Sequence, residues 1–258
     1  MPNYITDRCP TDAAMLYPRI CAHRGFSTVA PENTLPAYGA AIGLGADEIE
    51  FDLWQSKDGA IISSHDPTLD RVSDGHGDVR SFTLEELRQY DFGIKKSPHF
   101  AGLRIVTFEE ILQRFAKRTI MNIHIKQADI NIGEIMRLLR KYDAVEHCYF
   151  MSQIEPLLVR LKEEAPEVTR CFGGNPDTWD IVERAVKYDC KKIQLFKPAY
   201  NQQIIDDAHA HGIICNIYWS DEPEETRKML DMGMDCILSN DFQIVNETAK
   251  SWIERHKS

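Results

Sequence analysis

The chain has 258 residues, of which 43% are hydrophobic and 27% charged, with a formal net charge of −10. This size suits one large α/β domain, and the acidic balance argues against nonspecific nucleic-acid binding, which needs a basic face. No apolar run approaches the roughly 20 residues of a membrane-spanning helix, so we expect no membrane span.

The N-terminal segment, Met1–Pro18, has acidic and turn-forming residues where a secretory signal would have a basic start and an apolar core. The seven cysteines are scattered, include no Cys-x-x-Cys pair and are odd in number. This pattern favours reduced, mostly buried thiols over a disulfide framework or a zinc site. We therefore expect a cytoplasmic protein.

From residue 19 onward, short apolar runs alternate with helical patterns. The predicted strands are Arg19–His23, Glu48–Trp54, Thr119–Lys126, His147–Ser152, Val168–Phe172, Lys192–Phe196, Ile213–Trp219 and Cys236–Ser239. The predicted helices between them include Thr34–Leu44, Glu155–Glu164, Thr178–Lys187, Asn201–His211 and Glu224–Met232. Thr34 is a suitable N-cap, and Gly45, Gly212 and Gly233 follow helix ends. The alternation predicts a (β/α)₈ TIM barrel, with a doubly wound open sheet as the alternative.

The longest departure from this alternation lies between the second and third strands. An extra short strand, Ala60–His65, leads into the turn-rich Ser73–Asp78 and a short helix, Leu84–Tyr90. The segment is too short for a core of its own. We therefore interpret residues 66–105 as an insertion within a single barrel domain that covers residues 1–258.

Charged side chains gather at the predicted strand ends, where a parallel barrel carries its active site. His23 ends the first strand, and Glu50 and Asp52 lie near the end of the second. Their i, i+2 spacing puts both carboxylates on one face, and the alternating Phe51 and Leu53 then face the helices. Two inward carboxylates would repel each other and lose hydration, so we expect a divalent cation between them.

Other strand ends add basic and aromatic groups. His124 and Lys126 alternate with isoleucines in the third strand and should also point inward, while Arg24 follows His23. Tyr218 and Trp219 end the seventh strand, where each can contact substrate or simply pack at the rim. With His65 at the end of the extra strand, the set holds two imidazoles, a carboxylate pair and a fixed cation, the groups needed to cleave a phosphate ester.

The order of these motifs resembles one known family, the glycerophosphodiester phosphodiesterases. The motifs that carry the resemblance are His23–Gly25, Pro31–Thr34, Glu50–Asp52, His65–Asp66, Ser81–Leu87, Thr107–Leu112, Asn122–Lys126 and Gly233–Asp241. They span nearly the whole chain from residue 20 onward. The resemblance implies a barrel with a small insertion, and a phosphoric diester hydrolase that acts on small glycerophosphodiesters with a divalent metal ion.

The resemblance also implies a role for each charged group. These roles are acid–base catalysis for His23 and His65, metal binding for Glu50 and Asp52, and phosphate binding for Arg24 and Lys126. They agree with the chemistry, because a phosphodiester needs its charge neutralised, its nucleophile deprotonated and its leaving alkoxide protonated. Which histidine is the acid and which the base stays open. Glu32 and Asp66 are expected to stabilise their turns.

The third metal ligand departs from the family pattern. The family has glutamate on the third strand where this chain has His124. The expected cofactor is one divalent ion, Mg²⁺, Ca²⁺ or Mn²⁺, and an imidazole ligand shifts the preference from Ca²⁺ toward the transition series. Alternatively, water is the third ligand and His124 only forms hydrogen bonds around the site.

Several readings of the function stay open. One alternative is a related lyase that stops at a cyclic phosphate, and another is a non-catalytic barrel that binds phosphate esters. A metal-dependent sugar isomerase is a weaker option. The seventh strand end, Asn216–Asp221, and Val106 also depart from the family pattern. The leaving alcohol and the oligomeric state are therefore undetermined.

Overall fold

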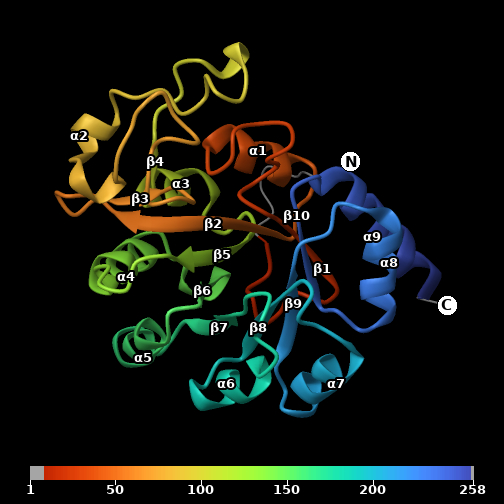
Figure 1. Ribbon diagram of the computed structural model, residues 1–258. Helices are drawn as coiled ribbons and strands as arrows, with labels where there is room; N and C mark the ends of the chain where they lie inside the picture. Colours follow the sequence, from red (N-terminus) through yellow and green to blue (C-terminus); the bar gives the residue numbers. More distant parts are fainter. Residues whose placement is uncertain (1–8, 257–258) are drawn as a thin grey trace.

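A closed barrel of eight parallel strands forms the centre of the molecule in the computed structural model, which describes residues 9–256 (Figure 1). Around the barrel the strands are β1 (Arg19–Ala22), β2 (Glu48–Gln55), β5 (Ile120–Ile125), β6 (Cys148–Ser152), β7 (Thr169–Gly173), β8 (Lys192–Phe196), β9 (Ile214–Tyr218) and β10 (Cys236–Ser239). Pairing of β10 with β1, and of β1 with β2, closes the ring. The TIM barrel prediction is confirmed, and the open-sheet alternative is wrong.

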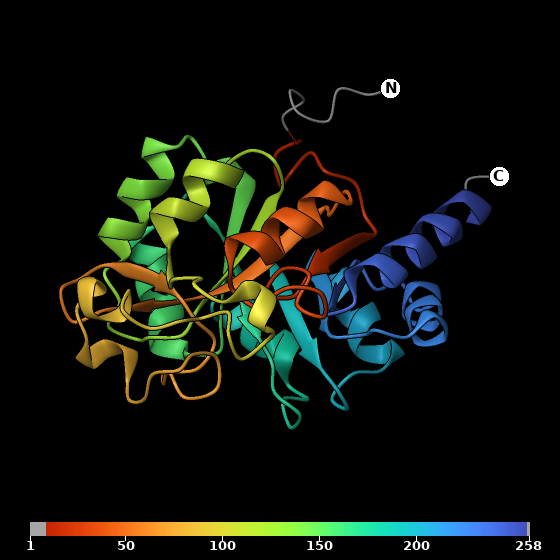
Figure 2. The same cartoon turned by 90° about the horizontal axis from the view of Figure 1, so that it is seen from above.

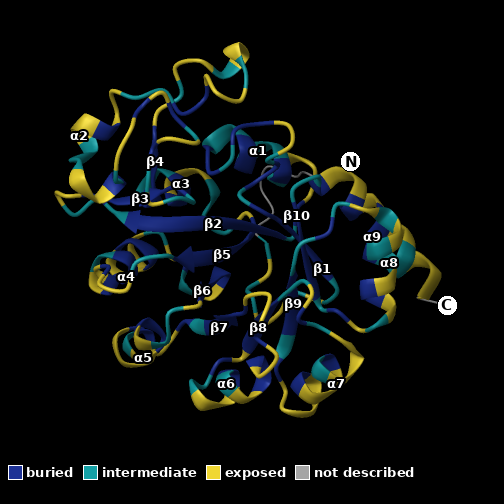
Figure 3. Cartoon of the chain, viewed as in Figure 1, coloured by how far each residue is buried: buried dark blue, intermediate teal, exposed yellow. Residues whose placement is uncertain are grey.

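Helices surround the strands, and their outward faces are exposed while the strands are buried (Figure 3). They are α1 (Leu35–Gly43), α3 (Phe108–Phe115), α4 (Ile132–Lys141), α5 (Glu155–Glu164), α6 (Ile181–Lys187), α7 (Gln202–Ala210), α8 (Pro223–Asp231) and α9 (Phe242–His256). A 3₁₀ turn, Val145–His147, precedes β6. Helix α6 begins three residues later than predicted, because Asn175 and Thr178 hydrogen-bond to nearby backbone amides instead.

Alternation along β2 places its acidic residues inside the barrel. The Phe51 ring packs on Tyr38 of α1 and Phe108 of α3, with ring centroids 5.8 and 6.0 Å apart. Because neighbouring residues of a strand point to opposite faces, the carboxylates of Glu48, Glu50 and Asp52 point into the barrel. All three are almost completely buried.

A network of buried charges closes the barrel at the amino ends of its strands. Arg19 donates to Glu48 Oε1 at 2.8 Å and to Asp12 Oδ1 at 2.6 Å, and its guanidinium also bonds the carbonyl of Met15. Lys192 donates to the same Asp12 oxygen at 2.8 Å. This end of the barrel is therefore filled by ion pairs and by the segment that precedes β1.

The segment between β2 and α3 extends the sheet and covers one side of the barrel. Strands β3 (Ile61–Ser63) and β4 (Val106–Thr107) continue from β2 in antiparallel pairing, and α2 (Leu84–Leu87) with 3₁₀ turns at Val79–Ser81 and Pro98–Phe100 lies between them. Figure 2 shows this segment on the side of the barrel away from α9.

This segment has more of a core than the sequence indicated. Its buried residues form a hydrophobic cluster separate from the main core, made of Trp54, Ile62, Leu69, Val79, Leu87, Phe92 and Ile105. Trp54 belongs to β2, so the cluster is completed by the barrel itself. Helix α2 is shorter than the predicted Leu84–Tyr90, and a turn replaces its last residues.

All seven cysteines are free thiols, six of them buried, as predicted. Within residues 9–256, no helix combines the length and the apolar character needed to cross a membrane. The prediction of no signal sequence concerned Met1–Pro18, and residues 1–8 of that segment lie outside the described part of the chain.

Candidate active site

A pocket opens at the carboxyl ends of the strands, and we call this end the mouth of the barrel. Its lining includes His23, Arg24, Asp52, His65, His124, Lys126, Met151, Gln153, Gly173, Gly174, Gln194, Phe196 and Tyr218. Six of the eight residues predicted for the site are in this lining. Glu50 contacts them from deeper in the barrel, and Trp219 is not part of the lining.

The carboxylates of Glu50 and Asp52 meet the imidazole of His124. Its Nδ1 lies 3.2 Å from Asp52 Oδ1 and 3.7 Å from Glu50 Oε1. The other oxygen of Asp52 accepts a hydrogen bond from Asn33 Nδ2 at 2.9 Å. Asp52 Oδ1 is buried and accepts no hydrogen bond from the described residues, although Lys126 Nζ is 3.4 Å away.

The charge of Asp52 is balanced mainly by neighbouring basic side chains, of which Lys126 contributes most. Burial alone would raise the pKa of this carboxyl group, but Lys126, His124 and Arg24 hold the pKa well below its ordinary value. Asp52 is therefore an ionised carboxylate at neutral pH, with one oxygen free for a ligand.

These residues fit a divalent metal ion. Ligand atoms of Glu50, Asp52 and His124 all lie within 4.8 Å of one another. Two ligands about 2.1 Å from one ion are roughly 3.0–3.4 Å apart, so the observed spacing needs only small adjustments. An unpartnered buried carboxylate oxygen, a second carboxylate and an imidazole form a donor set that suits Mn²⁺, Fe²⁺, Co²⁺ or Zn²⁺ better than Ca²⁺.

The His-Arg-Gly run places Arg24 beside these carboxylates. Arg24 has φ 57°, and its backbone N–H donates to Glu50 Oε2 at 3.0 Å. A Cβ on Gly25 would lie 2.6 Å from the backbone of Ala37, so only glycine fits there. The Arg24 side chain bonds Glu32 at 2.9 Å, while its buried Nε makes no hydrogen bond to the described residues. This Nε lies 3.7 Å from Asp52 Oδ2, so the guanidinium adds positive charge beside the carboxylates.

His23 is fixed in one tautomer by a partner from the last strand end. Its Nδ1 lies 2.7 Å from Oδ1 of Asn240, whose amide nitrogen donates to Asp221 at 3.0 Å. Because that second bond identifies Oδ1 as the acceptor, His23 Nδ1 carries the proton and Nε2 is left as an acceptor. Burial lowers the pKa of His23, which favours the neutral ring.

His65 is held in the same manner by its own neighbour. Its Nδ1 lies 2.7 Å from Asp66 Oδ1, so Nδ1 carries the proton when the ring is neutral. Burial lowers the pKa of His65 as well. The pocket thus contains two imidazoles, each held through Nδ1 by an oxygen acceptor, whose Nε2 atoms form no hydrogen bonds with the described residues.

Two residues that shape the pocket, Asn33 and Asn240, were not proposed from the sequence as site residues, whereas Tyr218 was expected, like Trp219, to contact substrate or to pack at the rim. Asn33 binds Asp52 through its side chain, and Asn240 orients His23. Tyr218 stands in the pocket, with its ring against His23 at a centroid distance of 4.6 Å. Trp219 points elsewhere, because its indole N–H donates to Asp221 at 2.9 Å. The Asn-Asp pair that ends the last motif was the one sequence signal for Asn240.

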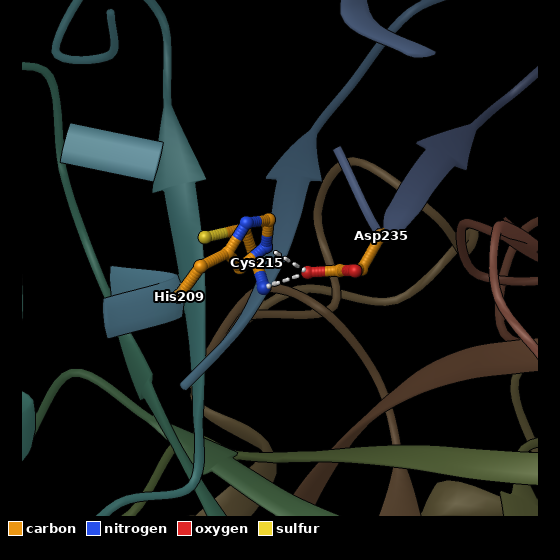
Figure 4. A group of neighbouring side chains, drawn as sticks. All are labelled: His209, Cys215 and Asp235. Carbon is orange, nitrogen blue, oxygen red and sulfur yellow. Dashed lines mark hydrogen bonds and ion pairs between the residues drawn. The ribbon is translucent and has the colours of Figure 1, made fainter. Parts of the chain in front are cut away.

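A second group of metal-ligand residues lies at the opposite end of the barrel (Figure 4). Asp235 Oδ2 accepts hydrogen bonds from His209 Nε2 at 2.8 Å and from the Cys215 backbone N–H at 2.7 Å. Burial raises the pKa of the Cys215 thiol well above its ordinary value, so it stays protonated. We interpret this cluster as a structural link that fastens α7 and β9 to β10.

Comparison with known proteins gives consistent matches. The model of the glycerophosphoryl diester phosphodiesterase family matches residues 23–244. A glycerophosphodiester phosphodiesterase of Caldanaerobacter subterraneus subsp. tengcongensis is 31% identical over 232 residues, which cover 86% of this chain and 93% of that protein. A glycerophosphodiester phosphodiesterase of Bacillus subtilis is 27% identical over 253 residues, covering 90% and 86%.

Solved structures show the same similarity. A phosphodiesterase of Oleispira antarctica, in complex with the product sn-glycerol-3-phosphate, superposes with a TM-score of 0.84 and 26% identity. The match covers 91% of this chain and 97% of that one. A glycerophosphodiester phosphodiesterase of Agrobacterium tumefaciens gives a TM-score of 0.77 at 26% identity, covering 89% and 99%.

Proposed function

This chain belongs to the glycerophosphoryl diester phosphodiesterase family and is a phosphoric diester hydrolase, and on this premise we propose that it hydrolyses small glycerophosphodiesters to glycerol phosphate and an alcohol. The observation that carries the proposal is the pair of imidazoles, His23 and His65, whose free Nε2 atoms share a pocket with Arg24 and the unpartnered oxygen of Asp52. A pocket that only bound a phosphate ester would not need two proton-transfer groups.

Glu50, Asp52 and His124 would hold one divalent cation in this proposal. The bound cation would neutralise the charge of the phosphodiester and lower the barrier to nucleophilic attack. Arg24 and Lys126, whose side-chain nitrogens lie 3.7 and 3.4 Å from the oxygens of Asp52, would hold the phosphate oxygens beside the cation. The imidazole of His124 favours a transition metal such as Mn²⁺.

The proposed reaction has two stages that use the same two imidazoles. One imidazole takes the proton from a glycerol hydroxyl next to the phosphate, and that oxygen forms a bond to phosphorus. The bond from phosphorus to the leaving alcohol breaks, and the other imidazole, which enters the reaction protonated at both ring nitrogens, gives its Nε2 proton to the departing oxygen. Water then opens the cyclic phosphate with the proton transfers reversed. Trp219 is a more distant candidate for contact with the leaving alcohol.

The sequence also predicts where the enzyme acts and how its chain is organised. We propose that it acts in the cytoplasm, where free thiols stay reduced. We also propose that residues 66–105 are an insertion within one barrel domain. Glu32 and Arg71 connect that insertion to the first strand end.

The decisive experiment is an assay of metal-depleted protein with a panel of glycerophosphodiesters and sugar phosphodiesters, each with Mg²⁺, Ca²⁺, Mn²⁺ or Zn²⁺ restored. We expect release of glycerol phosphate, highest with Mn²⁺ or another transition metal. Phosphorus NMR of the product identifies a lyase if a cyclic phosphate accumulates. No turnover of any glycerophosphodiester with any of these ions would refute the proposal.

A further inference from the structure

We propose that Arg71, a residue of the insertion, is a positioning residue that aligns His65 and Arg24 for phosphodiester cleavage. It is not among the residues that line the pocket at the mouth, and in this proposal it acts through two carboxylates. The inference rests on the proposed function, because it assigns Arg71 a part in the same reaction.

The guanidinium of Arg71 binds two carboxylates that come from different parts of the chain. Its Nη1 and Nη2 each donate to one oxygen of Glu32 at 2.7 Å. Its Nε donates to Asp66 Oδ2 at 2.6 Å. Glu32 lies in the connection after β1, and Asp66 in the connection after β3. One side chain thus links the insertion to the first strand end.

Each of these two carboxylates also binds a residue that lines the pocket. The remaining oxygen of Asp66 lies 2.7 Å from His65 Nδ1. Glu32 Oε1 also accepts from Arg24 Nη1 at 2.9 Å. An unbroken series of charged hydrogen bonds therefore runs from the proposed acid–base group to the proposed phosphate ligand, with Arg71 at its centre.

The geometry of the series requires an arginine. A guanidinium presents a two-pronged edge to Glu32 while its Nε faces Asp66, and the single ammonium of lysine cannot make both contacts in one plane. Although burial opposes it, Arg71 lowers the pKa of both Glu32 and Asp66 and so keeps them ionised. Without Arg71, two neighbouring carboxylates would lose their shared cation and would no longer hold a common position.

Because Arg71 is partly exposed, its ion pairs should matter little for folding stability, so an effect on activity can be distinguished from an effect on the fold. Its side chain is 47% exposed, and exposed ion pairs contribute little to folding stability. Arg88, also in the insertion, is a matched control: its side chain is 43% exposed, and it pairs with a single carboxylate, Glu110, at 3.1 Å. A role in positioning predicts different kinetics for the two arginines despite similar effects on stability.

The experiment compares Arg71→Gln, Arg71→Lys and Arg88→Gln in the full-length, metal-loaded enzyme. We expect Arg71→Gln to lower kcat about 10- to 100-fold, as is typical when the partner of an active-site residue is removed. Arg71→Lys should recover only part of that loss. Arg88→Gln should keep wild-type kcat, and the melting temperatures of Arg71→Gln and Arg88→Gln should be similar.

The pH profile provides a readout that a structural role would not change. His65 faces Asp66, Asp52, Lys126 and Arg24, with Arg71 behind Asp66. Removing Arg71 leaves the charge of Asp66 uncompensated, which favours the protonated imidazole. The limb of the kcat profile set by His65 should therefore move to higher pH in Arg71→Gln, but not in Arg88→Gln. Millimolar guanidinium, unlike sodium chloride, should partly restore kcat in Arg71→Ala.

Two results would overturn the inference. One is a kcat of Arg71→Gln equal to that of Arg88→Gln. The other is a loss of kcat in Arg71→Gln that comes with an unfolding temperature far below that of Arg88→Gln and an unchanged pH profile. His65→Ala is measured in parallel. If His65→Ala is inactive while Arg71→Gln is normal, only the present inference fails; if His65→Ala is fully active, the proposed function fails.

Discussion

Strand β2 carries two buried glutamates that point into the same barrel, and their surroundings differ. Glu48 accepts hydrogen bonds from Arg19 at 2.8 Å and from the Tyr149 hydroxyl at 2.7 Å, one on each oxygen. Glu50 accepts one hydrogen bond at 3.0 Å, from a backbone amide. Its side-chain neighbours, His124 and His23, are 3.7 and 3.9 Å away.

The difference shows how one strand can serve both stability and chemistry. At the amino end, buried carboxylates are matched by close cations from the protein itself. At the mouth, Glu50 is equally buried but pairs, among the described residues, only with two imidazoles at 3.7 and 3.9 Å, a state that is favourable only when a ligand completes it. Incomplete pairing of buried charge therefore distinguishes the two ends better than residue type does.

The largest expected effect tests whether the histidines at the mouth of the barrel carry out the proton transfers. Replacing His23 or His65 by alanine should each lower kcat by about 10²–10⁴-fold, because each removes one proton transfer. Steady-state kinetics with a glycerophosphodiester measures the loss, and circular dichroism should show an intact fold. Near-normal turnover in either variant would remove that histidine from the mechanism.

The next effect tests the mouth glutamate. Glu50→Gln keeps the shape and the acceptor for the Arg24 amide, but removes a negative charge from the metal site. Activity should fall by roughly 10³-fold, as several kcal/mol of charge stabilisation are lost, with little change in the free energy of unfolding. Calorimetric titration with Mn²⁺ should show the matching loss of affinity. Wild-type affinity for Mn²⁺ would contradict the assigned ligand.

Glu48→Gln is the same substitution two residues earlier, and the opposite outcome is expected. It leaves Arg19 with less compensation in a fully buried site, which should cost about 3 kcal/mol of unfolding free energy. Urea denaturation measures this cost. The folded fraction should keep its turnover and its metal affinity. A large loss of turnover without a loss of stability would contradict the assignment of Glu48 to stability alone.

A smaller effect concerns metal choice at the mouth. His124→Glu adds a negative charge and an oxygen ligand, so the affinity for Ca²⁺ relative to Mn²⁺ should rise about tenfold. Competition titrations of the metal-free variant and wild-type protein give this ratio. If wild-type protein already binds Ca²⁺ most tightly, or the ratio does not change, His124 is not a ligand.

The smallest expected effect is on the pH dependence of stability. Burial lowers the pKa of His65 below its ordinary 6.5, so the unfolded chain binds more protons than the folded protein between the two pKa values. The contribution of His65 to stability is therefore present above about pH 6.5 and is lost as the pH falls through that range. His65→Gln should show a shallower loss of stability between about pH 7 and pH 5 than the wild type. A replacement of the exposed His76 serves as the control.

Much of the fold could be predicted because it depends on local sequence patterns, such as strand alternation and glycines at helix ends. Alternation along β2 correctly separated Phe51 from Glu50 and Asp52, and the glycines after the helices have the positive φ angles that end them: 84° at Gly45, 67° at Gly212 and 88° at Gly233. The same alternation placed His124 and Lys126 in the pocket with Asp52. These features depend on neighbours within a few residues.

The remaining features depend on contacts between distant parts of the chain. Asn240 orients His23 from 217 residues away, and Glu48 pairs with Arg19 across two strands. Tyr218 is a partial exception, because alternation along β9 places it on the same inward face as Asn216 and so favours it over Trp219 as a pocket residue. Arg71 contacts Glu32 across 39 residues, through an insertion whose path no periodicity describes.

The closed amino end of the barrel determines how substrate enters and how products leave. Arg19, packed between Asp12 and the carbonyls of Met15 and Leu16, seals that end of the barrel. The mouth is then both entrance and exit. Substrate, alcohol and phosphate ester must all pass through this one opening. A product that dissociates slowly therefore blocks binding of the next substrate molecule.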